Sequence, residues 1–331
     1  MREERSIAEY KVWQNAWKEN INEPLIIALL DRWEVEYHNM EGDFWPPLSN
    51  EQIRDRIRNP LGSKTVRQLA EEGTEAIIVV DDLSRGTPVR PIAEFVLEEL
   101  LAGGISKEHI RFICALGNHK RREFEVVGDK ARCGLRRDIE EMTDMAGQFF
   151  KIDALLNARL DIIDLFAGDP KEEYYAAVEV SSRAKAMNMG EPKDVVIVNA
   201  NAKYNESSVA ATIANMELKP QGDIVLINHC PTGQMVHYVY GPFRRGYGGK
   251  CWMPYKERPG KSFRWIIYYT PYLEFMTKMS FDEPDKIIFA KTWDEVMRFL
   301  EEHGSGTKAS ILSDGTISYF LSILKYTRKE K

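Results

Sequence analysis

Two short apolar runs, at residues 76–80 and 110–116, each end in polar side chains and frame a helical segment from Val89 to Ala102. The first run, AIIVV, is continuous and rich in β-branched residues, which is typical of a parallel strand covered on both faces. Pro91 lies near the start of the helical segment, and two glycines follow its end, as helix boundaries favour. The pattern predicts a βαβ unit.

Three polar side chains follow these two predicted strands. Asp82 and Arg85 come after the first strand, and His119 comes after the second. Ligands of open parallel sheets bind outside the carboxyl ends of the strands, so we expect the three side chains at one rim. A guanidinium fork suits a carboxylate or another anion, and an imidazole suits proton transfer near neutral pH. The alternatives are that Asp82 only caps the following helix and that His119 is a solvated loop residue.

The second half of the chain repeats the alternation of apolar runs and helical segments. Strands are predicted at residues 194–199, 224–228, 286–289 and 309–312, with helices at 206–216 and 293–303. Lys203 and Glu206 follow the first of these strands and are expected to face a cleft. Capping of the next helix by Asn205 is the alternative reading of that turn. Residues 149–156 and 160–166 alternate as an antiparallel hairpin does.

These patterns predict an α/β protein with two domains, mostly parallel sheets and a cleft between them. The N-terminal α/β domain is expected over residues 1–134, and the C-terminal one over 135–331, which includes a connector helix at 135–147. The first seventy residues carry four tryptophans among charged residues. We expect them to form an arm that packs its aromatic side chains on the first domain.

Composition narrows the class of partner. With 44% hydrophobic and 29% charged residues, the 331-residue chain has the composition of a soluble globular protein. A formal net charge of −6 argues against nucleic acid as the main partner. No apolar run is long enough to span a bilayer, so no membrane is expected. Four scattered cysteines form no Cys-x-x-Cys pair, which favours a reducing cytoplasm over a disulfide framework or a zinc site.

The segment Asp81-Asp82-Leu83-Ser84-Arg85-Gly86-Thr87-Pro88 resembles the Asp-x-Thr-Arg-Pro-Thr-Pro signature of the nickel-pincer lactate racemase family, with Ser84 replacing Thr and Gly86 replacing Pro. The later Gly117-Asn118-His119 resembles the family's Gly-Thr-His. The resemblance implies an isomerase, a racemase or epimerase of a small 2-hydroxy acid, whose nickel-pincer nucleotide accepts the hydride. It also implies that His119 moves a proton, that Asp82 orients the imidazole and that Arg85 holds the substrate carboxylate. Lys203 and Glu206 then belong to the substrate side.

The chain departs from the family in one central segment. Only fifteen residues separate His119 from Leu135, where the family carries the lysine that anchors the cofactor and a histidine that binds nickel. The family's Gln and Lys on the later helix correspond by spacing to Glu206 and Val209. The sequence therefore leaves three hypotheses: an active racemase or epimerase, a degenerate anion-binding or hydroxy-acid-binding protein, and a metal-free lyase or isomerase using Glu206 with His119.

Overall fold

The computed structural model describes residues 6–14, 23–81, 85–115, 145, 149–231, 262–273, 277–278, 281 and 283–322. The chain divides into two compact units. The split unit comprises residues 1–41 and 185–331, and the inserted unit comprises residues 42–184. This division differs from the expected boundary after residue 134, because the N-terminal strands pack with the C-terminal part of the chain.

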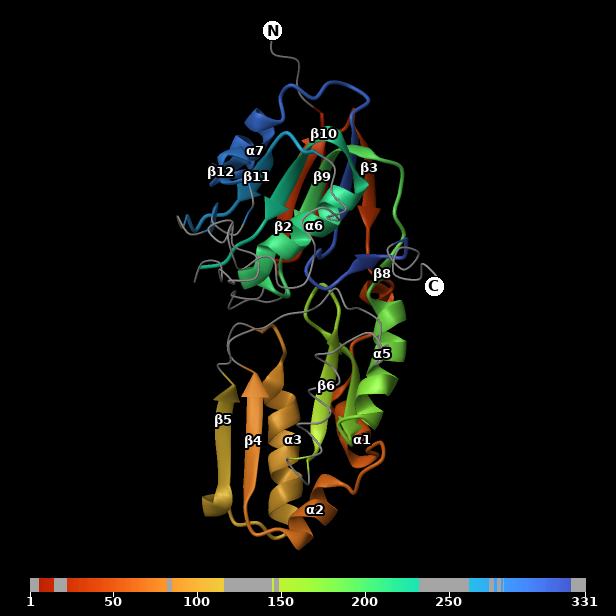
Figure 1. Cartoon of the computed structure of the whole chain (residues 1–331), viewed down its shortest axis with the longest axis vertical. Coiled ribbons are helices and arrows are strands. Elements are labelled where there is room, and N and C mark those ends of the chain that lie inside the picture. Colours follow the sequence, from red (N-terminus) through yellow and green to blue (C-terminus); the bar gives the residue numbers. More distant parts are fainter. Residues whose placement is uncertain are drawn as a thin grey trace. The chain divides into compact units, whose positions relative to one another are not determined.

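The split unit is built on a six-stranded sheet in which every neighbouring pair of strands is parallel. Its order is β12-β11-β10-β9-β13-β3 (Figure 1). The strands are β3 (Glu34–His38), β9 (Lys193–Asn199), β10 (Leu218–Ile227), β11 (Ile266–Tyr269), β12 (Ile287–Ala290) and β13 (Lys308–Leu312). The predicted α/β class with mostly parallel strands is confirmed. The strands β3 and β11 were not predicted.

A parallel sheet needs a cover on both faces, and the split unit provides one on each. Helix α6 (Ser207–Glu217) packs on β9 and β10 (Figure 1). The other face packs on α7 (Trp293–Phe299) and on the antiparallel pair β1 (Ile7–Val12) and β2 (Leu25–Leu30). A short parallel pair, β8 (Ala186–Met187) and β14 (Tyr319–Phe320), completes this unit.

The expected N-terminal arm is corrected by this packing. Trp33 is buried in the hydrophobic core of the split unit together with Val195 and Ile197 of β9. The strand after it, β3, pairs with β13 as the edge of the six-stranded sheet. The N-terminal strands therefore complete the second α/β unit instead of decorating the first, since their apolar side chains cover a face that α7 alone leaves open.

The inserted unit contains the predicted βαβ unit. Strands β4 and β5 are parallel neighbours, and α3 connects them, over the residues that the sequence predicted. The predicted antiparallel hairpin is also confirmed as the pair β6 and β7. The elements of this unit are α1 (Asn50–Arg58), α2 (Val66–Glu72), β4 (Ala76–Asp81), α3 (Val89–Ala102), β5 (Ile110–Ala115), β6 (Lys151–Leu156), β7 (Ile162–Gly168) and α5 (Glu172–Ala184).

A buried carboxylate joins the first three helices of the inserted unit. Glu99 of α3 accepts a hydrogen bond from Arg58 of α1 at 3.0 Å. Its other carboxylate oxygen lies 3.0 Å from the guanidinium of Arg67 of α2. The Arg58 guanidinium also lies over the ring of Phe95, 4.8 Å from its centroid. Because both carboxylate oxygens are used, Glu99 can lie in an apolar interface without an unpaired charge.

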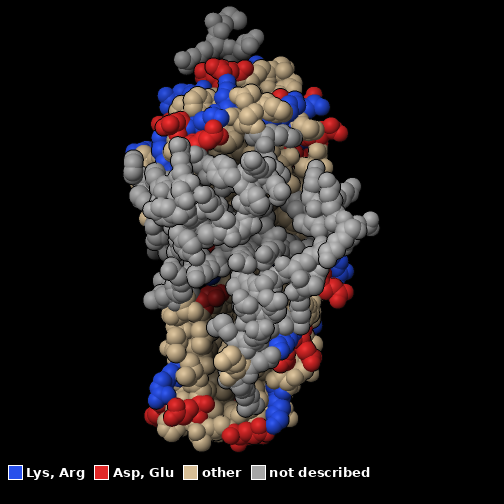
Figure 2. Space-filling model, viewed as in Figure 1, with Lys and Arg blue, Asp and Glu red and all other residues tan. Residues whose placement is uncertain are grey.

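Strand β4 is covered on one face only, and β5 is exposed along nearly its whole length, which corrects the expectation of burial on both faces. Ile77 and Val79 are each 58% exposed, and Ile113 beside them is 48% exposed. The surface over these strands is largely uncharged, and charged groups gather at its lower end in the space-filling view (Figure 2). Helix α3 therefore shields the inner face, while the outer apolar face stays open to solvent in the described part of the chain.

Two expected segments lie outside the described residues. The connector helix predicted at 135–147 does so except for Met145, and the N-terminal tryptophan Trp17 is likewise not described. Among the helices that the structure describes, none combines the length and the apolar character that crossing a bilayer requires.

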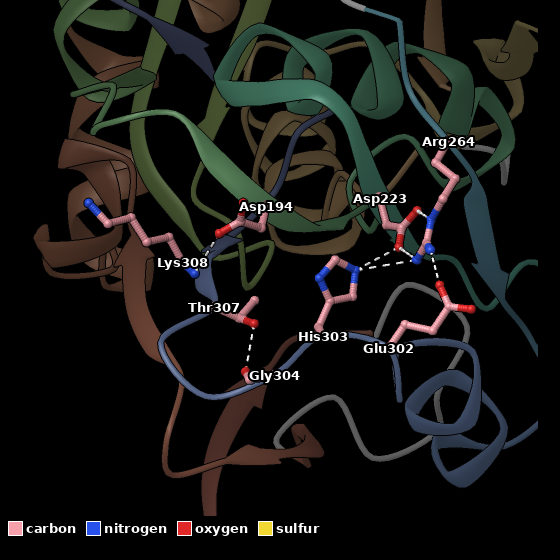
Figure 3. A network of polar contacts seen from close by, with 8 residues as sticks. All are labelled: Asp194, Asp223, Arg264, Glu302, His303, Gly304, Thr307 and Lys308. Carbon is pink, nitrogen blue, oxygen red and sulfur yellow. Dashed lines mark hydrogen bonds and ion pairs between the residues drawn. The ribbon is translucent and has the colours of Figure 1, made fainter.

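A polar network ties the amino-terminal end of the six-stranded sheet to the segment after α7 (Figure 3). Arg264 donates through Nε to Asp223 Oδ1 at 2.9 Å and through a terminal nitrogen to Oδ2, while His303 Nε2 lies 2.8 Å from Oδ2. Burial alone would raise the pKa of Asp223, but the bonds from His303 and Arg264 outweigh it and hold that pKa below its usual 3.8. Asp223 is thus an ionised, fully enclosed carboxylate with two partners.

We predict that Asp223→Asn lowers the free energy of unfolding by about 2–3 kcal/mol, because the amide leaves Arg264 without its bidentate partner. The matched control is Glu302→Gln, since Glu302 pairs with the same guanidinium but is 78% exposed. That variant should lose less than about 1 kcal/mol. Urea unfolding followed by circular dichroism measures both, and equal stabilities of the two variants would contradict the assignment.

Candidate functional site

The order of the six-stranded sheet defines a switch point between β9 and β13. From β9 the chain proceeds outward through β10, β11 and β12, and it then returns to place β13 on the other side of β9. The loops that leave the carboxyl ends of β9 and β13 consequently start side by side and diverge. Open parallel sheets bind their ligands at such a point. We therefore take these two loops as the candidate site of the split unit.

Asp314 fixes the two loops to each other. Its carboxylate is fully buried and accepts from the backbone nitrogens of Ala202 at 2.7 Å, Asn201 at 3.3 Å and Thr316 at 2.7 Å. The Thr316 hydroxyl donates a fourth bond at 2.6 Å, and the same hydroxyl accepts from the backbone nitrogen of Lys203. The loop after β13 thus holds three successive residues of the loop after β9.

A second set of amide side chains closes the carboxyl ends of β9 and β10. Asn199, the last residue of β9, donates to the carbonyl oxygens of Trp13 and Ser313. Gln14 contacts the Asn199 side chain and the ends of both strands, and its Oε1 accepts from the backbone nitrogen of His229 at 2.8 Å. The polar edge is therefore built without a charged group.

The start of α6 is connected to the same network. Asn228, which follows β10, donates to the carbonyl oxygens of Ala200 and Tyr204 at 3.0 and 2.7 Å. Its Oδ1 accepts from the hydroxyl of Tyr268 at 2.7 Å, and that hydroxyl lies 3.0 Å from Ser207 Oγ at the first turn of α6. The loop from β9 to α6 is consequently held at both ends.

The structure places Lys203 and Glu206 in this held loop. Lys203 is half-buried and Glu206 is buried, and Glu206 is the residue from which α6 begins. No side chain caps α6 by a hydrogen bond, so the alternative role of Asn205 as a cap is not what the structure has. Asn205 Oδ1 is instead a buried acceptor without a hydrogen bond, as is the hydroxyl Ser313 Oγ across the switch point.

In the inserted unit, the structure describes one of the three expected rim residues. Arg85 is half-buried in the turn between β4 and α3, where Thr87 Oγ1 donates to Asp81 at 3.1 Å. A Cβ on Gly86 would lie 2.8 Å from two carbons of Leu160, so glycine suits this position better than the family's proline. Asp82 and His119 lie outside the described residues.

Sequence reasoning missed the residues that organise the site. Asn199, Asn228 and Asp314 each follow a buried apolar run, which is the same signal that singled out Asp82 and His119. None of these three side chains was assigned a role from the sequence, because a single amide or carboxylate after a strand indicates no particular chemistry. Gln14 had no local signal, because its partners are more than 180 residues away in the chain.

The segment expected to hold the nickel-pincer nucleotide lies outside the described residues. In the described ranges, the only three-residue group of His, Cys, Asp and Glu able to share a metal is Glu36, His38 and Glu217. It lies between β3 and the end of α6, and its neighbour Lys193 is enclosed in an ion pair with Glu36. The lysines near His119 lie outside the described residues. No chemical step below therefore passes through this group.

Comparison with known proteins gives two findings. Residues 23–144 match the model of the lactate racemase N-terminal domain. The structure is similar to that of the lactate racemase apoprotein from Thermoanaerobacterium thermosaccharolyticum, with a TM-score of 0.60 and 13% sequence identity over 95% of this chain and 100% of that one. At this identity the structural likeness shows the fold. No curated protein sequence matches the chain.

We predict a pH dependence of stability that belongs to Asp314. Burial raises its pKa from 3.8 to about 6, against the four hydrogen bonds that lower it. Between pH 3.8 and about 6 the carboxyl group of Asp314 is therefore protonated in the folded state and ionised in the unfolded state. The stabilisation that this bound proton gives to the folded state is complete below pH 3.8 and disappears as the pH rises through 6. Relative to Asp314→Asn, the wild type should lose about 2–2.5 kcal/mol between pH 4 and pH 7. Urea unfolding of both proteins across this range measures it, and a constant difference would contradict the prediction.

Proposed function

Since this chain carries a lactate racemase N-terminal domain and is related to the lactate racemase family, we propose that it is a racemase or epimerase of a small 2-hydroxy acid. The observation that carries the proposal is the domain match over residues 23–144, which spans the turn with Arg85. The fold shared with a lactate racemase over nearly the whole chain supports it.

The proposed division of labour follows from the chemistry of each side chain. Arg85 holds the substrate carboxylate with its two parallel donors, and His119 takes the proton of the 2-hydroxyl group. Asp82 accepts a hydrogen bond from the imidazole and so fixes its tautomer. These residues account for the hydroxyl proton only, and the hydride that leaves C2 needs a separate acceptor.

The split unit contributes Lys203 and Glu206 in this proposal. The hydrogen bonds that Asp314, Asn199 and Asn228 make to the surrounding loop limit the movement of its backbone. Rigid support of this kind is what substrate-positioning groups require, because small displacements of a binding group reduce the rate strongly. Lys203 would bind an oxygen of the substrate, and Glu206, where the family has glutamine, would accept from its hydroxyl group.

A second candidate function is favoured by a specific feature of the sequence. The fifteen residues between His119 and Leu135 contain Lys120 and Lys130, and neither lies in the family's anchoring motif. A protein that keeps the anion site at Arg85 but has lost its cofactor would bind the 2-hydroxy acid without inverting it. A third candidate, a metal-free isomerase using Glu206 with His119, would remove the C2 hydrogen as a proton.

One experiment separates the three candidates. The purified chain, expressed with and without the enzymes that make the nickel-pincer nucleotide, is incubated in deuterium oxide with enantiopure lactate and a panel of other 2-hydroxy acids. Inversion without deuterium at C2 supports hydride transfer, inversion with deuterium supports the metal-free isomerase, and binding without inversion supports the degenerate protein. Neither inversion nor binding in any preparation would contradict the proposal. Intact mass and nickel content of the same samples report whether the cofactor is attached.

We predict that Arg85→Ala weakens substrate binding by about 30- to 150-fold, because a charge-assisted bidentate bond contributes about 2–3 kcal/mol. The loss should appear in KM, or in Kd if the protein only binds. Arg90→Ala is the matched control, since Arg90 lies five residues away and is 87% exposed in an ion pair with Glu94. Unchanged binding by Arg85→Ala would remove Arg85 from the site.

A further inference from the structure

A second cluster of metal-ligating side chains lies in the split unit, away from the loops of the candidate site. Glu36 and His38 alternate on the edge strand β3, and Glu217 is the last residue of α6. Each offers one ligand atom, and the three atoms lie within 4.8 Å of one another. His38 Nε2 is 2.9 Å from Glu217 Oε1 and 3.7 Å from Glu36 Oε2.

The imidazole nitrogen in this cluster is buried beside a carboxylate. His38 Nε2 is shielded from solvent and lies 2.9 Å from Glu217 Oε1. The ring is held by an edge contact with Phe320, whose centroid is 6.2 Å away. A buried imidazole nitrogen next to a carboxylate oxygen is suited to bind a cation together with it.

The carboxylates are oriented by other groups, as ligands in metal sites usually are. Glu217 Oε2 accepts from Ser310 Oγ at 2.6 Å, and its Oε1 accepts from the backbone nitrogen of Gly190 at 2.8 Å. Glu36 Oε1 pairs with Lys193 Nζ at 2.7 Å, which leaves Oε2 toward the imidazole. Both carboxylates are thus held by other groups, and each still has an oxygen within 4 Å of the imidazole nitrogen.

The charge of the cluster favours a cation here. Two carboxylates, Glu36 and Glu217, face one ammonium, that of Lys193, so a divalent cation would balance the charge of the cluster. The backbone at Gly190 lies close to these atoms, because a Cβ there would lie against Glu36 Oε2 and 3.1 Å from both Glu217 Oε1 and Lys193 Nζ. Glu36 is about half exposed, so the cluster is reached from solvent on its side.

We propose that Glu36, His38 and Glu217 bind one divalent cation of the zinc type. Imidazole nitrogen and carboxylate oxygen are both ligand types that zinc accepts, and three such ligands leave a fourth position open. Tetrahedral bonds of about 2.1 Å place ligand atoms roughly 3.4 Å apart, which lies between the two distances from His38. The site ties the edge strand β3 to the end of α6, and it does not depend on the proposed function.

The test is the binding of Zn²⁺ to the full chain by isothermal titration calorimetry, with bound zinc measured by elemental analysis after dialysis. The wild type should bind one zinc more than His38→Ala does. Glu36→Gln should weaken that zinc at least tenfold. Because this change also removes the charge that pairs with buried Lys193, circular dichroism checks that the variant is folded. Glu34→Gln is the matched control, because Glu34 is exposed two residues earlier on the same strand.

The melting temperature gives a second readout that a purely structural ion network would not show. Zn²⁺ should raise it in the wild type and in Glu34→Gln, and should raise it less in Glu36→Gln. The proposal is overturned if the wild type binds no zinc, or if His38→Ala and Glu36→Gln bind zinc as the wild type does. The latter result would assign any bound zinc to other residues. Glu36, His38 and Glu217 would then form an ion network in which Lys193 is the cation.

Discussion

The convergence of four hydrogen-bond donors on the buried carboxylate of Asp314 is the interaction on which the candidate site depends. It joins the loops that leave β9 and β13, which would otherwise diverge at the switch point of the sheet. Gly315 lets this loop approach closely, since a Cβ there would lie 2.5 Å from Val198 Cγ2. A carboxylate is suited to the position because it accepts several bonds at once, although enclosing its charge raises its pKa to about 6. The buried charge of Asp314 therefore lowers the stability of the fold at neutral pH, as residues that organise a functional site often do.

Periodicity in the sequence located most elements because apolar runs and helical stretches are local signals. The strands β4 and β9, the helix α3 and the hairpin of β6 and β7 were all predicted from such runs. The strand β3 was missed because Glu34-Val35-Glu36-Tyr37-His38 alternates with charged residues and is paired on one side only, as the edge of the sheet. Its partner β13 follows about 270 residues later, so no local pattern could assign it. The domain division depended on the same long-range pairing.

Two of the five expected site residues, Asp82 and His119, stay predictions from the sequence, and Arg85, Lys203 and Glu206 now have a described local setting. The network around the last two could not be predicted, because hydrogen bonds such as those of Gln14 and Asp314 join segments more than 100 residues apart. The inserted unit shows a further departure. Its parallel pair exposes Ile77, Val79 and Ile113, although parallel strands are usually covered on both faces. The segment that the family resemblance predicts to be shortened comes after the second of these strands.

The rigidity of the loop that carries Lys203 and Glu206 is most directly measured by native-state hydrogen exchange of its backbone amides. If Asp314 holds this loop, the amides of Ala202 and Lys203 exchange slowly in the wild type at pH 7. In Asp314→Asn they should exchange at least about tenfold faster, while the amides of β11 keep their wild-type rates. Equally slow exchange of Ala202 and Lys203 in both proteins would show that other contacts hold the loop, and would contradict the role given to Asp314.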